Sequence, residues 1–336
     1  MIPHTHDDVG WLKTPDEYFS GSDYLIQRAG VELILETVIR ELIKDPIKRF
    51  SYVEMKFFSM WFEEQTPAMK DQVRSLVQQG RLEFLNGGWS MSDEACPHFD
   101  DFINNMQYGH DFLMREFGVR PRIAWHIDPF GHSSAAPRLF AEMGFDAWFF
   151  SRLDYQDKIR RMAELEMEFI WRPFFQHDGK RTQIFTHTLY SGYASPNSFD
   201  FDTQSNDPPI VDDPSLSTFN LPERIGTLRA WLDHQASHYK ANVTGHLLVV
   251  MGEDFRFGNA RQYFDSLDKL IKGFNANYTD MQLIYSTPGI YLDAISTGTN
   301  TGMAWPLSTM TCSHTRIASS VSGRAISHQG LQTKSM

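Results

Sequence analysis

The sequence of 336 residues predicts an α/β fold with largely parallel strands. Short apolar runs of strand length alternate with longer amphipathic periods along the chain, a pattern typical of βαβ units. No linker-like stretch divides the chain, and no repeat of fixed period is present. The hydrophobic fraction of 41% is enough to bury a substantial core. We therefore expect one large α/β domain.

The expected elements follow from the spacing of apolar residues. Val31, Leu35, Val38 and Leu42 form an i, i+4, i+7, i+11 stripe, which predicts an amphipathic helix within 25–46. A polar stretch with Pro and Asp at 195–214 predicts a loop. Further helices are expected at 62–79, 100–117, 135–143, 221–239, 260–274 and 289–296. Strands are expected at 1–3, 51–58, 81–89, 122–127, 146–150, 166–172, 182–189, 246–251 and 282–285.

The octet His4-Thr5-His6-Asp7-Asp8-Val9-Gly10-Trp11 is the most informative motif. Side chains at i and i+2 of an extended segment point to the same face, so His6 and Asp8 form a clip with one nitrogen and one oxygen ligand. This pair suits a divalent metal such as zinc. Gly10 and Trp11 add a tight backbone and a flat apolar wall of the kind a sugar site needs. The alternative is a polar transition from strand to loop.

Polar clusters follow several of the expected strands. His6 and Asp8 follow 1–3, Asp128 follows 123–127, and Glu253 and Asp254 follow 247–251. A fourth cluster, Gly87, Gly88, Asp93 and Glu94, follows 82–85. The carboxyl ends of parallel strands line one face of a sheet or barrel, so these clusters are expected to converge there. The alternative is that strand ends are polar because loops are polar.

Two carboxylates have contexts that suit glycoside hydrolysis. Pro129 and Gly131 fix Asp128 beside Phe130, and a bound metal would keep its carboxylate ionised and able to act as a nucleophile. Asp254 is a reasonable partner acid, and such chemistry requires two carboxylates with separate roles. The alternatives are an ion pair between Asp254 and Arg256 and a helix-capping role for Asp128.

Composition excludes several classes of function. The net charge of −11, without a basic run, argues against a general nucleic-acid or membrane-surface binder. No apolar run approaches transmembrane length, and no signal peptide is recognisable. Cys96 and Cys312 lie outside any metal-type spacing. Acceptor sequons at Asn242 and Asn277 favour the secretory pathway weakly. The aromatic fraction of 14% fits a sugar pocket and an ordinary core equally well.

Four motifs together resemble glycoside hydrolase family 38, especially its lysosomal α-mannosidase branch. They are the octet 4–11, the block Gly87-Gly88-Trp89 with Asp93-Glu94-Ala95, the segment 125–133, and the segment 252–257. Their order and separation agree from about residue 2 to Pro306. The resemblance implies a seven-stranded (β/α) barrel-like domain with largely parallel strands. It also implies a zinc-dependent retaining exo-α-mannosidase acting on mannose-containing oligosaccharides of N-glycan type, in the lysosome or secretory pathway.

The resemblance also implies residue roles. His6, Asp8 and Asp128 match zinc ligands, Asp128 matches the nucleophile, and Asp254 matches the general acid/base. A retaining mechanism predicts that the carboxyls of Asp128 and Asp254 lie about 5 Å apart. His4 is a candidate for supporting the zinc ligands. The positions that match sugar contacts are Trp11, Phe130, Arg152 and Tyr193.

The chain departs from the family at its end. The family has a further zinc-ligating His, a helical bundle and a β-sandwich region beyond this domain. We expect 1–306 to form the catalytic domain and 307–336, rich in Ser, Thr, Arg and His, to be a disordered tail in which His314 and His328 are not ligands. A shifted reading frame would explain the tail, and sequencing the transcript across Pro306 tests this. The alternative functions are a non-catalytic fragment with a partial zinc or sugar site, and a metal-dependent polysaccharide deacetylase.

Overall fold

The computed structural model describes residues 1–173, 179–298 and 304–309. Its strands are β1 (Ile2–Pro3), β2 (Phe50–Tyr52), β3 (Leu82–Phe84), β4 (Ile123–His126), β5 (Ala147–Phe150), β6 (Glu168–Trp171), β7 (Ile184–Thr188), β8 (Val250–Met251) and β9 (Leu307–Ser308). Its helices are α1 (Pro15–Ser20), α2 (Val31–Lys44), α3 (Met55–Glu64), α4 (Pro67–Gln78), α5 (Phe99–Phe117), α6 (Ala135–Glu142), α7 (Tyr155–Glu164), α8 (Leu221–Ala236), α9 (Ala241–Thr244), α10 (Ala260–Asn277) and α11 (Pro288–Gly298), with a 3₁₀ helix at Gly179–Thr182.

The strands pair in three groups. β4-β5-β7-β6-β9 form one sheet, β1 pairs with β8, and β2 pairs with β3. Every pair is parallel except β6 with β7. A parallel bridge between His4 and Ser51 connects the β1 and β2 segments, and the Asn86 N–H donates to the Ile123 carbonyl between the β3 and β4 segments. The predicted α/β fold with parallel strands is confirmed, but the sheet is mixed, and the pairings among described residues do not establish a closed ring of seven strands.

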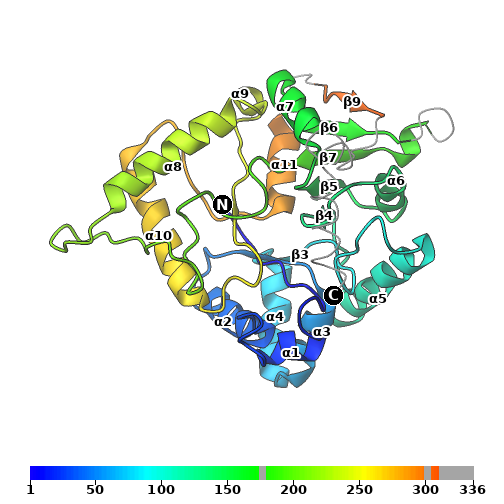
Figure 1. Ribbon diagram of the computed structural model, residues 1–336, viewed down its shortest axis with the longest axis horizontal. Coiled ribbons are helices and arrows are strands. Elements are labelled where there is room, and N and C mark those ends of the chain that lie inside the picture. Colours follow the sequence, from blue (N-terminus) through cyan, green and yellow to red (C-terminus); the bar gives the residue numbers. More distant parts are fainter. Residues whose placement is uncertain (174–178, 299–303, 310–336) are drawn as a thin grey trace.

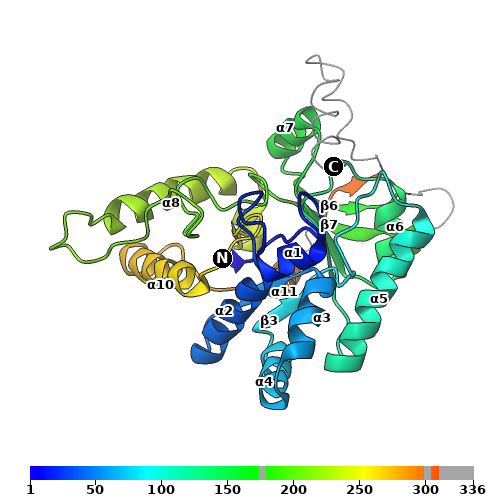
Figure 2. The same ribbon diagram turned by 60° about the horizontal axis from the view of Figure 1, so that its bottom comes forward.

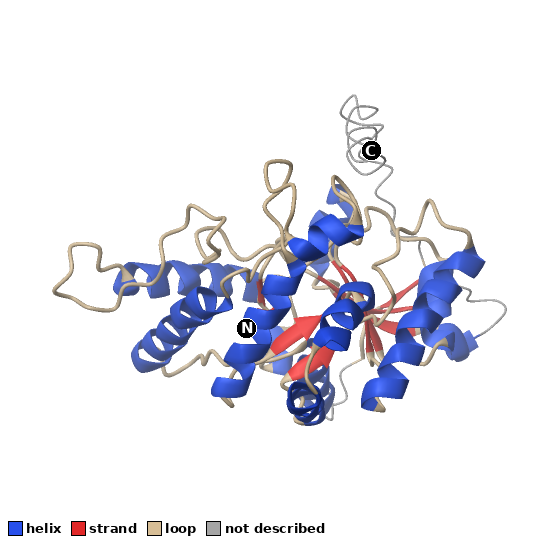
Figure 3. Cartoon of the chain, turned by 90° about the horizontal axis from the view of Figure 1, so that it is seen from below, coloured by secondary structure: helices blue, strands red, loops and turns tan. Residues whose placement is uncertain are grey.

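The strands lie in the interior of the molecule and the helices lie mostly outside them (Figure 3). Helices α2, α3, α4 and α5 contact one another as a group beside β2 and β3, and α8 and α10 form a second contacting pair (Figures 1 and 2). No helix in the described part of the chain combines the length and hydrophobicity needed to cross a bilayer.

The central strands are buried on both faces. In β4, Ile123 and Trp125 pack in one core cluster with Phe149 of β5, whereas Ala124 packs in another with Trp148. Successive side chains of a strand point to opposite faces, so this alternation places one cluster on each side of the sheet. Strands covered on both faces read as continuous apolar runs, which is why β4 and β5 are easily recognised in the sequence.

Three predicted elements are wrong, and the strands predicted at 81–89 and 246–251 are confined to Leu82–Phe84 and Val250–Met251. The strand predicted at 51–58 ends at Tyr52, and α3 begins at Met55. The single helix predicted at 62–79 is interrupted because Thr66 caps the Met69 N–H and Pro67 starts a new helix. No strand forms at 282–285, although Met1 exchanges backbone hydrogen bonds with Ile284 and Ser286.

Helices α1, α7 and the short α9 were absent from the sequence prediction. Thr14 and Glu17 form a capping box that starts α1, and Asp154 accepts hydrogen bonds from the backbone at the start of α7. The loop predicted at 195–214 is confirmed, since no helix or strand lies between β7 and α8.

The expected tail begins inside the sheet. Leu307 and Ser308 form β9 beside β6, and the Pro306 carbonyl accepts a hydrogen bond from the Ile170 N–H. The remainder of the segment, 310–336, which contains Cys312, His314 and His328, lies outside the described residues.

Candidate active site

The predicted convergence of polar clusters is seen at the carboxyl ends of the parallel strands. His6 follows β1, Asp128 follows β4, Arg152 follows β5, and Asp254 follows β8. A parallel bridge pairs His6 with Asp254, which brings two segments far apart in the sequence into register at this point. Residues 248 positions apart in the sequence therefore share one site, as expected for a parallel α/β sheet.

His6, Asp8 and Asp128 form a compact group whose ligand atoms all lie within 4.8 Å of one another. The His6 Nε2 lies 3.2 Å from Asp8 Oδ1 and 3.7 Å from Asp128 Oδ2. One imidazole nitrogen and two carboxylate oxygens are a donor set that suits zinc. Burial lowers the pKa of His6, but Asp8 and other carboxylates outweigh it and raise the pKa well above its usual value. The carboxylates that favour a positive charge on His6 also favour a bound cation, so His6, Asp8 and Asp128 fit a divalent metal.

Glu54 supports this group from the other side of the His6 ring. Its Oε1 lies 3.5 Å from His6 Nδ1, and its side chain is 1% exposed. Burial raises the pKa of Glu54, and contact with His6 opposes the rise. A carboxylate on the far nitrogen orients a ligating imidazole. The sequence analysis missed Glu54; its signal was an acidic residue directly after an apolar strand.

Arg152 and Tyr193 link the two candidate catalytic carboxylates. The Arg152 guanidinium donates to Asp128 Oδ1 at 3.0 Å, and the Tyr193 hydroxyl donates to Asp254 Oδ1 at 2.9 Å. Burial raises the pKa of Tyr193, and both carboxylates raise it further, so the phenol remains a donor. The Arg152 guanidinium also lies over the Tyr193 ring, so Asp128, Arg152, Tyr193 and Asp254 lie in one connected group.

The remaining predicted residues surround this group. His4 donates from Nε2 to the Tyr193 carbonyl at 2.9 Å, and burial lowers the pKa of His4 to about 4. The Arg152 guanidinium lies 5.8 Å from the ring centres of both Phe130 and Tyr193. Trp11 is half-buried against the large core cluster, three residues beyond Asp8. His4 thus contacts the backbone of Tyr193, whose hydroxyl donates to Asp254.

The structure favours neither alternative role for the carboxylates. Arg256 pairs with the side chains of Asp200 and Glu253, and the backbone carbonyl of Asp254 accepts a hydrogen bond from it. The N-cap position of α6 belongs to Ser134.

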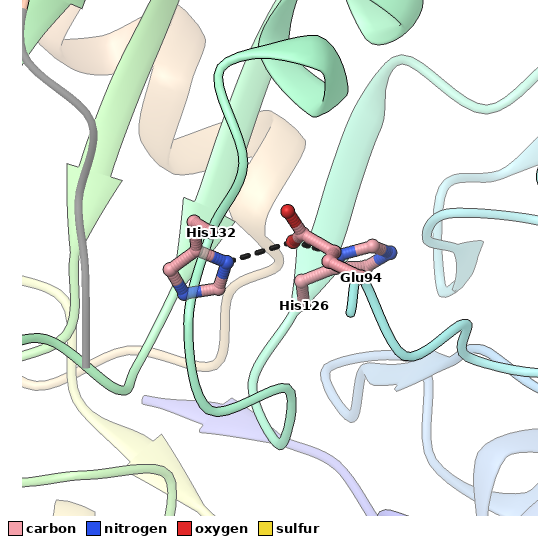
Figure 4. A group of neighbouring side chains, drawn as sticks. All are labelled: Glu94, His126 and His132. Carbon is pink, nitrogen blue, oxygen red and sulfur yellow. Dashed lines mark hydrogen bonds and ion pairs between the residues drawn. The ribbon is translucent and has the colours of Figure 1, made fainter. Parts of the chain in front are cut away.

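Figure 4 shows a second group of neighbouring side chains, formed by Glu94, His126 and His132. Glu94 Oε1 lies 2.8 Å from His126 Nδ1 and 2.7 Å from His132 Nδ1. Its Oε2 accepts the Ser133 N–H at 3.0 Å. The pKa of Glu94 falls to about 2, because contacts with His132 and His126 outweigh the opposing effect of burial. All three lie in motifs singled out in the sequence, where Glu94 is expected to converge with the other polar clusters but none of the three has a predicted role.

Comparison with known proteins agrees with this geometry. The model of the glycosyl hydrolases family 38 N-terminal domain matches residues 1–312. The chain belongs to this family. Lysosomal alpha-mannosidase of Homo sapiens is 47% identical over 297 residues, which cover 87% of this chain and 29% of that protein. The Dictyostelium discoideum protein of the same name is 43% identical over 311 residues, covering 92% and 30%. The family 38 chain thus spans less than a third of these relatives.

Solved structures share the fold at low identity. An alpha-mannosidase from Enterococcus faecalis V583 has a TM-score of 0.65 and 18% identity, covering 93% of this chain and 30% of that chain. A putative polysaccharide deacetylase from Mycobacterium smegmatis has a TM-score of 0.51 and 13% identity, covering 92% and 93%. At these identities the likeness shows the fold alone.

Proposed function

We propose that this chain is the catalytic domain of a zinc-dependent retaining exo-α-mannosidase that removes terminal α-D-mannosyl residues from N-glycan-type oligosaccharides. One observation carries the proposal: Asp128 belongs both to the metal-ligand group and to the group that contains Asp254. Because Asp128 belongs to both groups in this family 38 chain, its carboxylate would contact both the metal and the reacting sugar.

The proposed chemistry uses the two carboxylates in separate roles. Asp128 attacks the anomeric carbon as Asp254 gives its proton to the leaving glycosidic oxygen, and a glycosyl ester forms. Asp254 then takes a proton from water, the water oxygen attacks the anomeric carbon, and the ester bond to Asp128 breaks. Tyr193 positions the Asp254 carboxylate through its 2.9 Å hydrogen bond.

His6, Asp8 and Asp128 would hold the zinc, which when bound supplies positive charge for mannose hydroxyls. Arg152 balances the charge of Asp128 through their 3.0 Å ion pair. Trp11, Phe130 and Tyr193 offer aromatic surface for sugar contact. The proposal extends to location in the lysosome or secretory pathway, as the names of the relatives suggest, and to further domains in the full-length protein.

Turnover of a chromogenic α-mannoside by the purified chain tests the proposal. Asp128→Asn should lose turnover at least 10³-fold, whereas the exposed Asp111→Asn on α5 should match the wild type. Retention predicts that α-mannose is the first product seen by NMR. Initial β-mannose would refute the mechanism, and bound zinc without turnover would favour the non-catalytic fragment. Acetate release from an acetylated polysaccharide, without mannosidase turnover, would favour the deacetylase.

A further inference from the structure

We propose that His132, anchored by Glu94, is a positioning residue that holds Arg152 against Asp128. His132 Nε2 lies 3.0 Å from the Arg152 carbonyl, and its Nδ1 lies 2.7 Å from Glu94 Oε1. The inference rests on the proposed mannosidase function for its activity readout, but its structural readout is independent of turnover.

The hydrogen bonds fix the state of the His132 ring. A carbonyl oxygen only accepts, so Nε2 must carry a hydrogen for Arg152. Glu94 Oε2 already accepts the Ser133 N–H, and Oε1 faces ring nitrogens of both His126 and His132. An ionised Glu94 requires an N–H from each ring, so His132 donates from both nitrogens and forms an imidazolium paired with Glu94.

Packing prevents the His132 ring from turning away. The ring stands at 90° to Trp148 with centres 5.1 Å apart, and its centre lies 4.3 Å from that of Phe150. The side chain of His132 is 0% exposed. Because its anchor and its walls are both buried, the ring presents a fixed donor to the segment that follows β5.

One short turn therefore holds Arg152 at two points. Asp128 accepts from the guanidinium at 3.0 Å, and His132, four residues later, donates to the Arg152 backbone. Phe130, between them, lies under the guanidinium. Loss of the backbone contact leaves Arg152 free to shift along the turn, and small displacements of a charged group at a reacting centre slow catalysis strongly.

His126 provides a matched comparison for the experiment. It also contacts Glu94 Oε1, at 2.8 Å, and its side chain is equally buried, but none of its hydrogen bonds given by the structure reaches Arg152. His132→Gln replaces the two ring N–H donors on opposite sides of the ring with a single amide NH2 group and loses the charge. We expect His132→Gln to lower kcat/KM for an α-mannoside by about 10–100-fold. His126→Gln should keep kcat/KM within about threefold of the wild type, although both variants should show a similar drop in Tm.

A double-mutant cycle with Arg152→Ala tests whether His132 acts through Arg152. In the Arg152→Ala background, His132→Gln should change kcat/KM by less than about twofold. A loss as large as that in the wild-type background overturns the proposal. So does an equal loss of kcat/KM in His126→Gln, because the effect would then reflect packing around Glu94.

Absence of mannosidase turnover would refute the proposed function but not the positioning role of His132. Two measurements test that role without turnover. A crystal structure of His132→Gln should lack the 3.0 Å contact between Arg152 and Asp128, and its persistence overturns the inference. If that variant does not fold, ¹⁵N NMR of histidine-labelled wild-type chain should show both His132 nitrogens protonated; a single protonated nitrogen overturns it. If Glu94→Gln loses bound zinc, then Glu94, His126 and His132 form a metal site, and the positioning role of His132 is overturned.

Discussion

Replacing Gly252 with alanine tests whether the close approach of β8 to β1 holds the candidate active site together. A Cβ on Gly252 would lie 1.8 Å from the His4 carbonyl oxygen and 2.8 Å from its carbon, where ordinary contacts are 3.4–4 Å. The atoms in the way are backbone, so no side chain can turn aside to relieve the clash. The β8 segment must move away from β1.

The cost follows from the hydrogen bonds on either side of Gly252. The His4 N–H donates to the Met251 carbonyl at 3.0 Å, and the His6 N–H donates to the Glu253 carbonyl at 3.1 Å. Breaking two buried backbone hydrogen bonds, at about 1–3 kcal/mol each when the groups stay unsatisfied, predicts a loss of about 3–5 kcal/mol. That is a large part of the about 5–15 kcal/mol that stabilises a typical domain.

Urea unfolding monitored by circular dichroism measures this loss. Gly258→Ala is the matched control, because a Cβ there meets no heavy atom within 4 Å. We expect Gly252→Ala to lose about 3–5 kcal/mol of its free energy of unfolding and Gly258→Ala to stay within about 0.5 kcal/mol of the wild type. If Gly252→Ala unfolds within about 1 kcal/mol of the wild type, β1 and β8 are not packed as described, and the site geometry built on them is wrong.

Three further predictions concern individual side chains. Glu54→Gln should weaken zinc binding about 10–100-fold because His6 loses its orienting carboxylate, and competition with a chelator measures it. Tyr193→Phe should lower kcat/KM about tenfold by removing the donor to Asp254. Steady-state kinetics measure this, and an unchanged kcat/KM would contradict the positioning role of Tyr193. Glu94 has its pKa lowered from 4.5 to about 2, so it stabilises the fold above pH 4.5 and that contribution is lost as pH falls toward 2. Unfolding of Glu94→Gln should therefore depend less on pH across this window.

The sequence predicted the interior strands well and the outer helices less well. Strands β4 and β5 are buried on both faces, so their short continuous apolar runs predict buried strands. The boundary between β2 and α3 was missed because the segment from Phe57 to Phe62 is apolar in both readings. Short helices such as α1 and α7 depend on capping by Thr14 and Asp154, which periodicity does not detect.

The candidate site was predictable where its residues are neighbours in sequence or share a recognised motif. His6, Asp8 and Asp128 were named and do lie together, and Arg152 and Tyr193 do contact the carboxylates. Glu54 was missed because its partner is 48 residues away and no spacing rule connects them. The role of His132 depends on a hydrogen bond to the Arg152 backbone carbonyl. Every residue has a backbone carbonyl, so the amino-acid sequence does not indicate this contact.

Strand register, more than any single side chain, assembles this site. The bridge between His6 and Asp254 places a metal-ligand candidate beside the acid/base candidate, and the flanking pair is Pro3 with Met251. A slip of one residue would set His6 against Glu253, whose carboxylate is already paired with Arg256, and would point Asp254 to the opposite face. The tight contact at Gly252 opposes that slip, because any residue with a Cβ brought to this position meets the His4 backbone. Gly252, which has no side chain, thus helps to decide which carboxylate faces the candidate active site.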